Sequence, residues 1–332
     1  MNQFTNAIGI DVSKKTLDAY DHTNCTALQV TNDRAGFAQL VKWSKKSNCD
    51  ISAVIFCFEH TGMYSLPLAV YLSGQKLNYA IVSGLEVKKS QGIQRGKSDK
   101  KDSIVLAQYA YQRRESIKVY CLPSTNILAL KSLLSLREKM VTERAGYKAS
   151  QKEMRTFYKK FNSTDSVFSI QQKLISELSS QIVKVEKEIA AIINKDVELK
   201  RVFSLVTSVK GVGLILGTTL MVYTNCFTAF DNARKFASYC GIAPFDYQSG
   251  TSIKGRKKVS HFANKRIKAL LSNAACTSIQ FNPEMKLYYE KRINEGKNKM
   301  SVQNVIRNKI MMRVFAVVQR GTPYVDTFKF AA

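Results

Sequence analysis

The sequence predicts an α/β domain followed by an all-α region. Over roughly the first 120 residues, short apolar runs alternate with amphipathic segments, which is typical of a sheet with helices on its faces. From Asn126 to about Asp196, apolar residues recur every three or four positions, as in long helices. Shorter helical patterns continue after Val202. We therefore expect two domains, over residues 1–122 and 201–325, joined by a helical coiled-coil arm over residues 123–200.

Three strands are predicted near the N-terminus, where short apolar runs are separated by polar turns. They cover Ala7–Asp11, Leu17–Asp21 and Ala27–Thr31, and their close spacing favours an antiparallel meander. Asn32 or Asp33 is then suited to cap a helix.

The following elements alternate between strand and helix. Val54–Glu59 is a continuous apolar run, typical of a buried central strand. A helix near Tyr64–Leu72, a strand at Tyr79–Val82 and a helix from Asp99 to about Gln112, capped by Ser98, complete the pattern. Three strands, a helix, a strand, a helix, a strand and a helix form the order of an RNase H-like domain. In that order the first and fourth strands are neighbours.

Four carboxylates lie where these elements end or begin. Asp11 and Glu59 close the first and fourth strands, and Asp99 and Asp102 lie three residues apart at the start of a helix. Each could serve only as a turn former, or as an acid favoured by a helix dipole. Together, in this order of elements, they favour a site for one or two Mg²⁺ ions, which prefer oxygen ligands.

The charge of the chain points to a polyanionic partner. The 332 residues include 51 Lys+Arg against 25 Asp+Glu, a formal net charge of +26. Solvated helix faces are often Lys-rich, but no acid lies between Asp246 and Glu284. The candidate phosphate contacts flank the acids and a Ser-Gly segment; they are Arg95, Lys97, Lys100, Lys101, Lys254, Arg256, Lys257, Lys258, Lys265 and Arg266.

The seven cysteines form no C-x-x-C pair, and their odd number does not suit a disulfide framework. We expect reduced thiols in a cytoplasmic protein. The N-terminus lacks a signal-peptide pattern, and the longest apolar stretch is too short for a bilayer. The sequence thus favours a soluble protein without a membrane partner.

The helical region contains one long apolar seam. It passes through Leu174, Leu178, Ile182, Val185, Ile189 and Ile192. This coiled-coil type of spacing fits either packing within one chain or an arm that joins protomers. Further along, Val209-Lys210-Gly211-Val212-Gly213 resembles a phosphate-holding turn before a helix, but it could equally be an ordinary tight turn.

Several short motifs resemble those of the DEDD transposases of bacterial insertion sequences, a family that includes Piv-type DNA invertases and bridge-RNA-guided recombinases. In the first third of the chain they are Gly9-Ile10-Asp11-Val12-Ser13-Lys14, Phe58-Glu59-His60-Thr61-Gly62-Met63-Tyr64 and Lys97-Ser98-Asp99-Lys100-Lys101-Asp102-Ser103. In the distal half they are the glycine turn above, Phe236–Pro244 and Gln248–Ser252. Cys240 and the segment Phe245–Tyr247 depart from the family pattern. These departures concern the preference for a target DNA more than the class of reaction.

The resemblance implies a RuvC-like domain whose metal site is Asp11, Glu59, Asp99 and Asp102. It also implies a helical transposase domain in which Ser249, or Ser252 as a fallback, is the nucleophile. The expected activity is Mg²⁺-dependent cleavage and rejoining of double-stranded DNA through a serine–DNA link, by a dimer or tetramer. A structured guide RNA is implied for one branch and DNA inversion for the other.

Two alternatives remain beside this function. One is a RuvC-like junction-resolving nuclease in which Ser249 is only structural. The other is a non-catalytic nucleic-acid-binding scaffold that uses the same basic surface.

Overall fold

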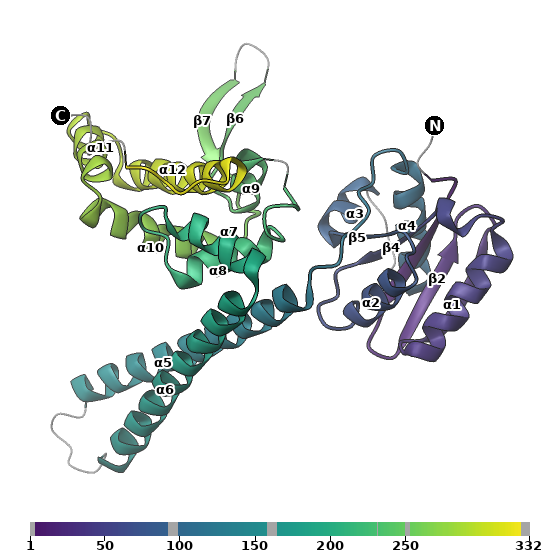
Figure 1. The fold of residues 1–332 in the computed structure, drawn as a ribbon, viewed down its shortest axis with the longest axis horizontal. Helices are drawn as coiled ribbons and strands as arrows, with labels where there is room; N and C mark the ends of the chain where they lie inside the picture. Colours follow the sequence, from purple (N-terminus) through teal and green to yellow (C-terminus); the bar gives the residue numbers. More distant parts are fainter. Residues whose placement is uncertain (1–3, 92–98, 158–164, 231, 250–252, 327–332) are drawn as a thin grey trace. The chain divides into compact units, whose positions relative to one another are not determined.

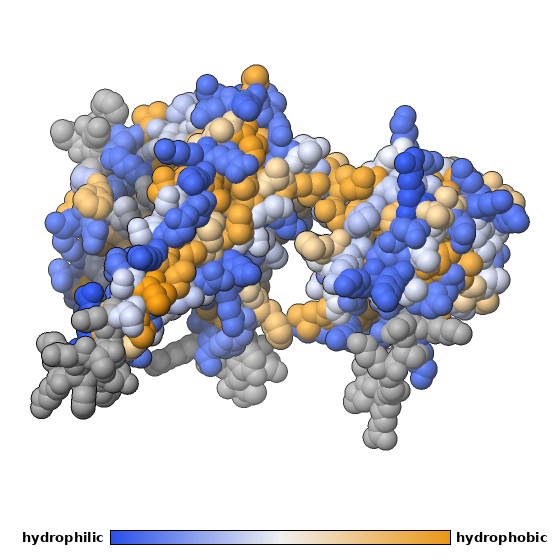
Figure 2. Space-filling view, turned by 90° about the horizontal axis from the view of Figure 1, so that it is seen from below, coloured by the Kyte–Doolittle hydropathy of each residue, from blue (hydrophilic) through white to orange (hydrophobic). Residues whose placement is uncertain are grey.

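The computed structural model describes residues 4–91, 99–157, 165–230, 232–249 and 253–326. The chain divides into two compact units, Met1–Leu122 and Pro123–Ala332. Hydrophilic and apolar side chains are interspersed on the face of each unit that Figure 2 shows. None of the described helices has the length and apolar character needed to cross a membrane.

The first unit is built on a five-stranded sheet (Figure 1). Its strands are β1 (Asn6–Val12), β2 (Thr16–Asp21), β3 (Thr26–Thr31), β4 (Val54–Glu59) and β5 (Tyr79–Val82), in the order β3-β2-β1-β4-β5. The first three strands form an antiparallel meander, and β4 pairs in parallel with β1 and β5. The predicted adjacency of the first and fourth strands is therefore confirmed.

Helices cover both faces of this sheet. On one face, α1 (Arg34–Ser47) and α2 (Leu66–Gly74) bury apolar residues against Ile8, Ile10 and Phe56. On the other face lie α3 (Gly84–Ser90) and α4 (Asp99–Gln112). A single 3₁₀ turn, η1 (Ile51–Ala53), precedes β4.

The helix starts test two of the predicted caps. The Asp33 side chain accepts a hydrogen bond from the Gly36 N–H, so Asp33 is the cap of α1. Ser98 lies outside the described residues. Helix α3 was not predicted, because its seven residues are too few to show a period and only Val87 is buried.

Helix α4 packs directly against β1 at Gly9. A Cβ atom at this position would overlap the backbone oxygen of Ser103 and the backbone nitrogen of Ala107, and would lie 2.9 Å from the Ala107 Cα. Since backbone atoms cannot rotate away as side chains do, only glycine allows this approach. Leu106, Ala107 and Ala110 are then buried on the side of α4 that faces the sheet.

The second unit begins with two long helices, α5 (Thr125–Phe157) and α6 (Asp165–Lys195). They pack against each other in antiparallel fashion, since Arg137 pairs with Glu186 while Arg144 reaches Ser179. Of the predicted seam, Ile182, Val185 and Ile189 are buried. Packing within one chain is therefore observed, whereas an arm that joins protomers stays a prediction.

The seam prediction was wrong at one end of α6. Leu174 is 40% exposed, and the buried neighbour is Ile175. Leu178 and Ile192 are only half-buried. A straight helix drifts relative to a strict heptad pattern, so the residue that faces the partner changes along its length.

The remainder of the second unit surrounds a helical core. It contains α7 (Val197–Thr207), α8 (Leu214–Tyr223), α9 (Ala233–Tyr239), α10 (Lys265–Phe281), α11 (Pro283–Asn294) and α12 (Lys299–Arg320). Between α9 and α10 the strands β6 (Pro244–Ser249) and β7 (Ile253–Val259) pair as an antiparallel ribbon. The segment that contains Ser249 is thus a strand of a ribbon, which the expectation of a helical domain did not include. Residues 245–248 alternate between apolar and polar, but β7 is mostly basic and shows no such alternation, so the sequence does not indicate a pair of strands.

We expect Gly9→Ala to destabilise the first unit by about 1–3 kcal/mol, because the new methyl group overpacks against backbone atoms. Chemical or thermal unfolding of the full chain measures the change. Gly74→Ala is the matched control, since its Cβ would meet no atom within 4 Å. Equal unfolding midpoints for the two variants would contradict the close packing of α4 on β1.

Four of the seven thiols should react quickly with Ellman's reagent at pH 8. Cys25, Cys49, Cys121 and Cys276 are exposed. Burial raises the pKa of Cys57 and Cys240 to about 12 and that of Cys226 to about 11, so these thiols stay protonated. All seven should react in denaturant without reductant; a smaller number there would reveal a disulfide.

Candidate active site

The carboxylates of β1 and β4 lie side by side at the edge of the sheet where both strands end. In the parallel register Ile10 pairs with Phe58, so the next residues, Asp11 and Glu59, are neighbours about one strand spacing (~4.8 Å) apart. Side chains alternate along a strand, and Gly9 faces α4. Asp11 therefore faces α4 too, as does Glu59, which is half-buried like Asp11.

Helix α4 begins at this same edge. Its Ser103 lies against Gly9, whereas Tyr111 stacks on His22, with ring centroids 4.0 Å apart. The backbone N–H of His22 donates to the Ala7 oxygen, near the start of β1. The helix thus runs opposite to β1, and its first turn lies towards Asp11. Asp102 is half-buried in that turn, and Asp99 is the first helical residue, although its side chain lies outside the described set.

A further carboxylate, which the sequence reasoning missed, joins this row. Asp18 on β2 pairs directly with Asp11, and its side chain is only 7% exposed. It accepts a hydrogen bond of 2.9 Å from the Gln29 amide. The alternation of Leu17, Asp18 and Ala19 could have shown that Asp18 faces away from the apolar side of the sheet.

Glu59 is held from the side of α3. A Cβ atom at Gly84 would lie 2.5 Å from the Glu59 Oε2, so the carboxylate occupies space that any other residue would fill. Helix α3 is in turn joined to α4, because the Tyr109 hydroxyl donates to the Glu86 carboxylate over 2.5 Å. Burial and this hydrogen bond raise the pKa of Tyr109, which keeps the hydroxyl a donor.

The loops that follow the two carboxylates are joined by one side chain. The Asn32 amide nitrogen donates to the Ser13 oxygen over 2.7 Å and to the Tyr64 oxygen over 3.1 Å. Ser13 follows Asp11, and Tyr64 follows Glu59. Asn32 therefore fixes the spacing of both loops at the edge of the sheet.

The residues at this edge suit a hard divalent cation. Asp11 and Asp18 occupy directly opposite positions on neighbouring strands, so a divalent cation bound beside them would reduce the repulsion between the two carboxylates. The candidate ligands at this edge of the sheet are all carboxylate oxygens, the ligand type that Mg²⁺ prefers. Among the described side chains, no three of Asp, Glu, His or Cys are yet gathered around one point, so the carboxylates would have to close around an ion.

Ser249 is located in the second unit, as the last residue of β6. In the backbone register it pairs with Ile253, and the neighbouring Gln248 pairs with Lys254. Ser252 lies outside the described residues. The described basic residues of the ribbon include Lys258, which is exposed, and Lys257, whose ammonium lies 2.8 Å from the Asp246 carboxylate.

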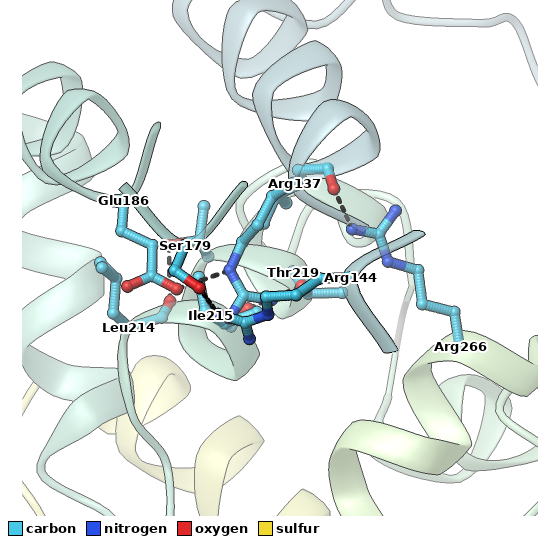
Figure 3. Close-up of polar contacts among 10 residues, drawn as sticks. Arg137, Arg144, Ser179, Glu186, Leu214, Ile215, Thr219 and Arg266 are labelled. Carbon is cyan, nitrogen blue, oxygen red and sulfur yellow. Dashed lines mark hydrogen bonds and ion pairs between the residues drawn. The ribbon is translucent and has the colours of Figure 1, made fainter. Parts of the chain in front are cut away.

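The predicted phosphate contacts differ in their surroundings. Lys101 and Lys265 are exposed. Arg266, in contrast, donates to the Leu134 oxygen over 2.5 Å (Figure 3). It also pairs with Glu138 over 2.8 Å. Its charge is thus used to join α10 to α5. Arg95 and Lys97 lie outside the described residues, as do the side chains of Lys100, Lys254 and Arg256.

The glycine turn before α8 is packed rather than open. Gly211 has φ +91°, and a Cβ there would lie 3.0 Å from the Ala274 oxygen of α10. The start of α8 borders a cavity of about 290 Å³ that is also lined by Glu186. This carboxylate accepts from Arg137 over 2.7 Å (Figure 3). A phosphate bound at the start of α8 would therefore lie near the Glu186 carboxylate and would be repelled by it. This favours the interpretation of the glycine segment as an ordinary tight turn.

Comparison with known proteins gives the family. Residues 8–156 match a DEDD transposase family of the IS110 type, and residues 203–290 match the transposase IS116/IS110/IS902 family. The fold and these matches define a transposase-class enzyme of DNA recombination. The chain belongs to the DEDD transposase family of IS110-type insertion elements.

Several relatives agree with this assignment. A pilin gene-inverting protein of Moraxella lacunata is 29% identical over 330 residues, covering 96% of this chain and 97% of that protein. Its counterpart in Moraxella bovis is 28% identical over 327 residues, with the same coverage. An uncharacterized 43.6 kDa protein of insertion element IS110 from Streptomyces coelicolor is 28% identical over 155 residues, covering 46% of this chain and 38% of that protein.

Proposed function

We propose that this protein is a Mg²⁺-dependent DNA recombinase that cleaves and rejoins strands through a covalent serine–DNA link. The observation that carries the proposal is the row Asp18–Asp11–Glu59, with the first turn of α4 beside it. Strand order and helix placement in the first unit support an RNase H/RuvC-like domain. The relatives that are named for pilin gene inversion support strand exchange over simple cutting.

Asp11, Glu59, Asp102 and Asp99 are the residues that we assign to the metal. Bound Mg²⁺ would neutralise charge on a scissile phosphate and on the leaving oxygen. The chain's own part is to hold these carboxylates at fixed spacing: the β1–β4 pairing sets Asp11 and Glu59, and the approach of α4 at Gly9 sets Asp102. Asp18, buried and hydrogen-bonded by Gln29, would add negative charge from the far side of Asp11.

Ser249 is the proposed nucleophile. Its hydroxyl oxygen forms a bond to phosphorus while the bond from phosphorus to a deoxyribose oxygen breaks. The serine proton passes to solvent and the leaving oxygen takes up a proton, which gives a phosphoserine link and a free DNA hydroxyl. Because the number of phosphoester bonds is unchanged, a new hydroxyl can reverse the step and rejoin the strand.

The net charge of +26 supports duplex DNA as the substrate. Exposed Lys258 and Lys265 are suited to contacts with the DNA backbone. We do not assign this role to Arg266, since its guanidinium is already bound to Leu134 and Glu138. A structured guide RNA and a dimeric or tetrameric assembly stay predictions.

A covalent adduct assay tests the proposal. End-labelled DNA from the regions that flank the gene in its genome is incubated with Mg²⁺ and the protein, and denaturing gels detect protein-linked label. We expect the adduct to disappear in Ser249→Ala and to persist in Ser252→Ala. Asp11→Asn should abolish it, whereas Asp50→Asn should not, because Asp50 is an exposed cap before β4.

Each alternative has a distinct result in this assay. Loss of the adduct only in Ser252→Ala would move the nucleophile to that residue. Cleavage that survives Ser249→Ala, with no adduct in any variant, would favour a junction-resolving nuclease. Binding without cleavage by wild type and all variants would favour a scaffold.

Metal binding itself is testable through Gly84. In Gly84→Ala the new methyl would meet the Glu59 carboxylate, so this ligand must shift. We expect Mg²⁺ to raise the unfolding temperature of the wild type and to raise that of Gly84→Ala less, because weaker binding contributes less stabilisation. Gly74→Ala should respond like the wild type. If Mg²⁺ raised the unfolding temperature of all three proteins equally, Glu59 would not be a metal ligand.

A further inference from the structure

The loop that follows Glu59 presents apolar side chains to solvent. Met63 is 83% exposed and Tyr64 is 44% exposed. Leu66 and Val70, at the start and in the middle of α2, are 38% and 48% exposed. Met63 lies four residues after a candidate catalytic carboxylate, and these four exposed apolar residues are close together in the sequence. A group of exposed apolar side chains, unlike a single one, indicates an interaction surface.

The loop has a defined shape. Gly62 adopts φ +64°, a conformation that glycine accepts without strain. Its N–H donates to the His60 Nδ1 over 3.2 Å, and the Tyr64 N–H donates to the Thr61 oxygen over 3.3 Å. The Asn32 amide then holds the Tyr64 oxygen. Met63 is thus held outward on a turn that is anchored on both sides.

The surroundings of the turn carry positive charge. Lys14 and Lys15 are exposed on the β1–β2 turn, which Asn32 joins to the Met63 turn through Ser13. Lys88 is exposed on α3, whose first residue contacts Glu59. An exposed apolar side chain on a turn that is hydrogen-bonded to a lysine-bearing turn is suited to DNA, which has phosphates on the outside and stacked bases inside.

We infer that Met63 is a wedge that enters the base stack of bound DNA and opens the step beside the scissile phosphate. This inference rests on the proposed function, since it places DNA at the carboxylates. Methionine is one of the apolar residues that unstack base steps, at a cost of a few kcal/mol per step. A step that is already weakened costs less to open, so the protein should prefer DNA with a mismatch.

The test uses two 20-base-pair duplexes that carry 2-aminopurine at the same central position. They differ in one base, which is paired in one duplex and forms a mismatch beside the 2-aminopurine in the other. Ca²⁺ replaces Mg²⁺ to hold back cleavage. We expect the wild type to bind the mismatched duplex about tenfold more tightly, equivalent to ~1.4 kcal/mol, and to raise its 2-aminopurine fluorescence. Met63→Ser should lose both effects, and Met63→Leu should keep them.

Met300→Ser is the matched control, because Met300 is 63% exposed on α12 in the other unit. It should behave like the wild type. Equal affinity of the wild type for both duplexes, absence of binding, or an unchanged preference in Met63→Ser would overturn the wedge. So would a change in oligomeric mass in Met63→Ser with the preference intact, which would assign Met63 to a protein contact. The serine adduct assay does not depend on a wedge, so the two proposals can fail separately.

Discussion

The close approach of α4 to β1 at Gly9 is the constraint on which the candidate metal site depends. Because there is no Cβ, the backbone of the helix lies directly on the strand. The first turn of α4 is thereby placed at the end of the sheet where β1 and β4 finish. Asp102 can then approach Asp11 and Glu59 although more than 40 residues separate it from either in the sequence.

The site edge is then reinforced by polar contacts from several elements. Asn32 joins the turn after Asp11 to the turn after Glu59, and the Tyr109–Glu86 hydrogen bond joins α3 to α4. Gly84 leaves the space that the Glu59 carboxylate takes. These contacts restrict the positions that the segments bearing Asp11, Glu59 and Asp102 can take. In metalloproteins, loss of the groups that orient the ligands typically weakens metal binding by about tenfold to a hundredfold.

In the second unit, charge is used in two different ways. Arginines between the long helices and the core are internal links, as with Arg137 to Glu186 and Arg266 to Leu134 (Figure 3). Lys258 on the β6–β7 ribbon is exposed, so its charge is available to a polyanion. The exposed pair of Lys257 and Asp246 adds little stability, since solvent screens such pairs.

The order of strands and helices along the first unit, the positions of Asp11 and Glu59 at strand ends, and the basic balance could all be predicted from the sequence, because local periodicity and composition carry this information. The motifs also indicated the family. The pairing of Asp18 with Asp11, the internal contacts of Arg266 and the place of Ser249 at the end of a strand were visible only in the folded structure. Register and side-chain partners arise from contacts between distant segments, and the mostly basic residues of β7 show no alternating apolar pattern. The drift of the α6 seam from Leu174 to Ile175 has the same origin, since the partner helix, not the heptad count, selects the buried face.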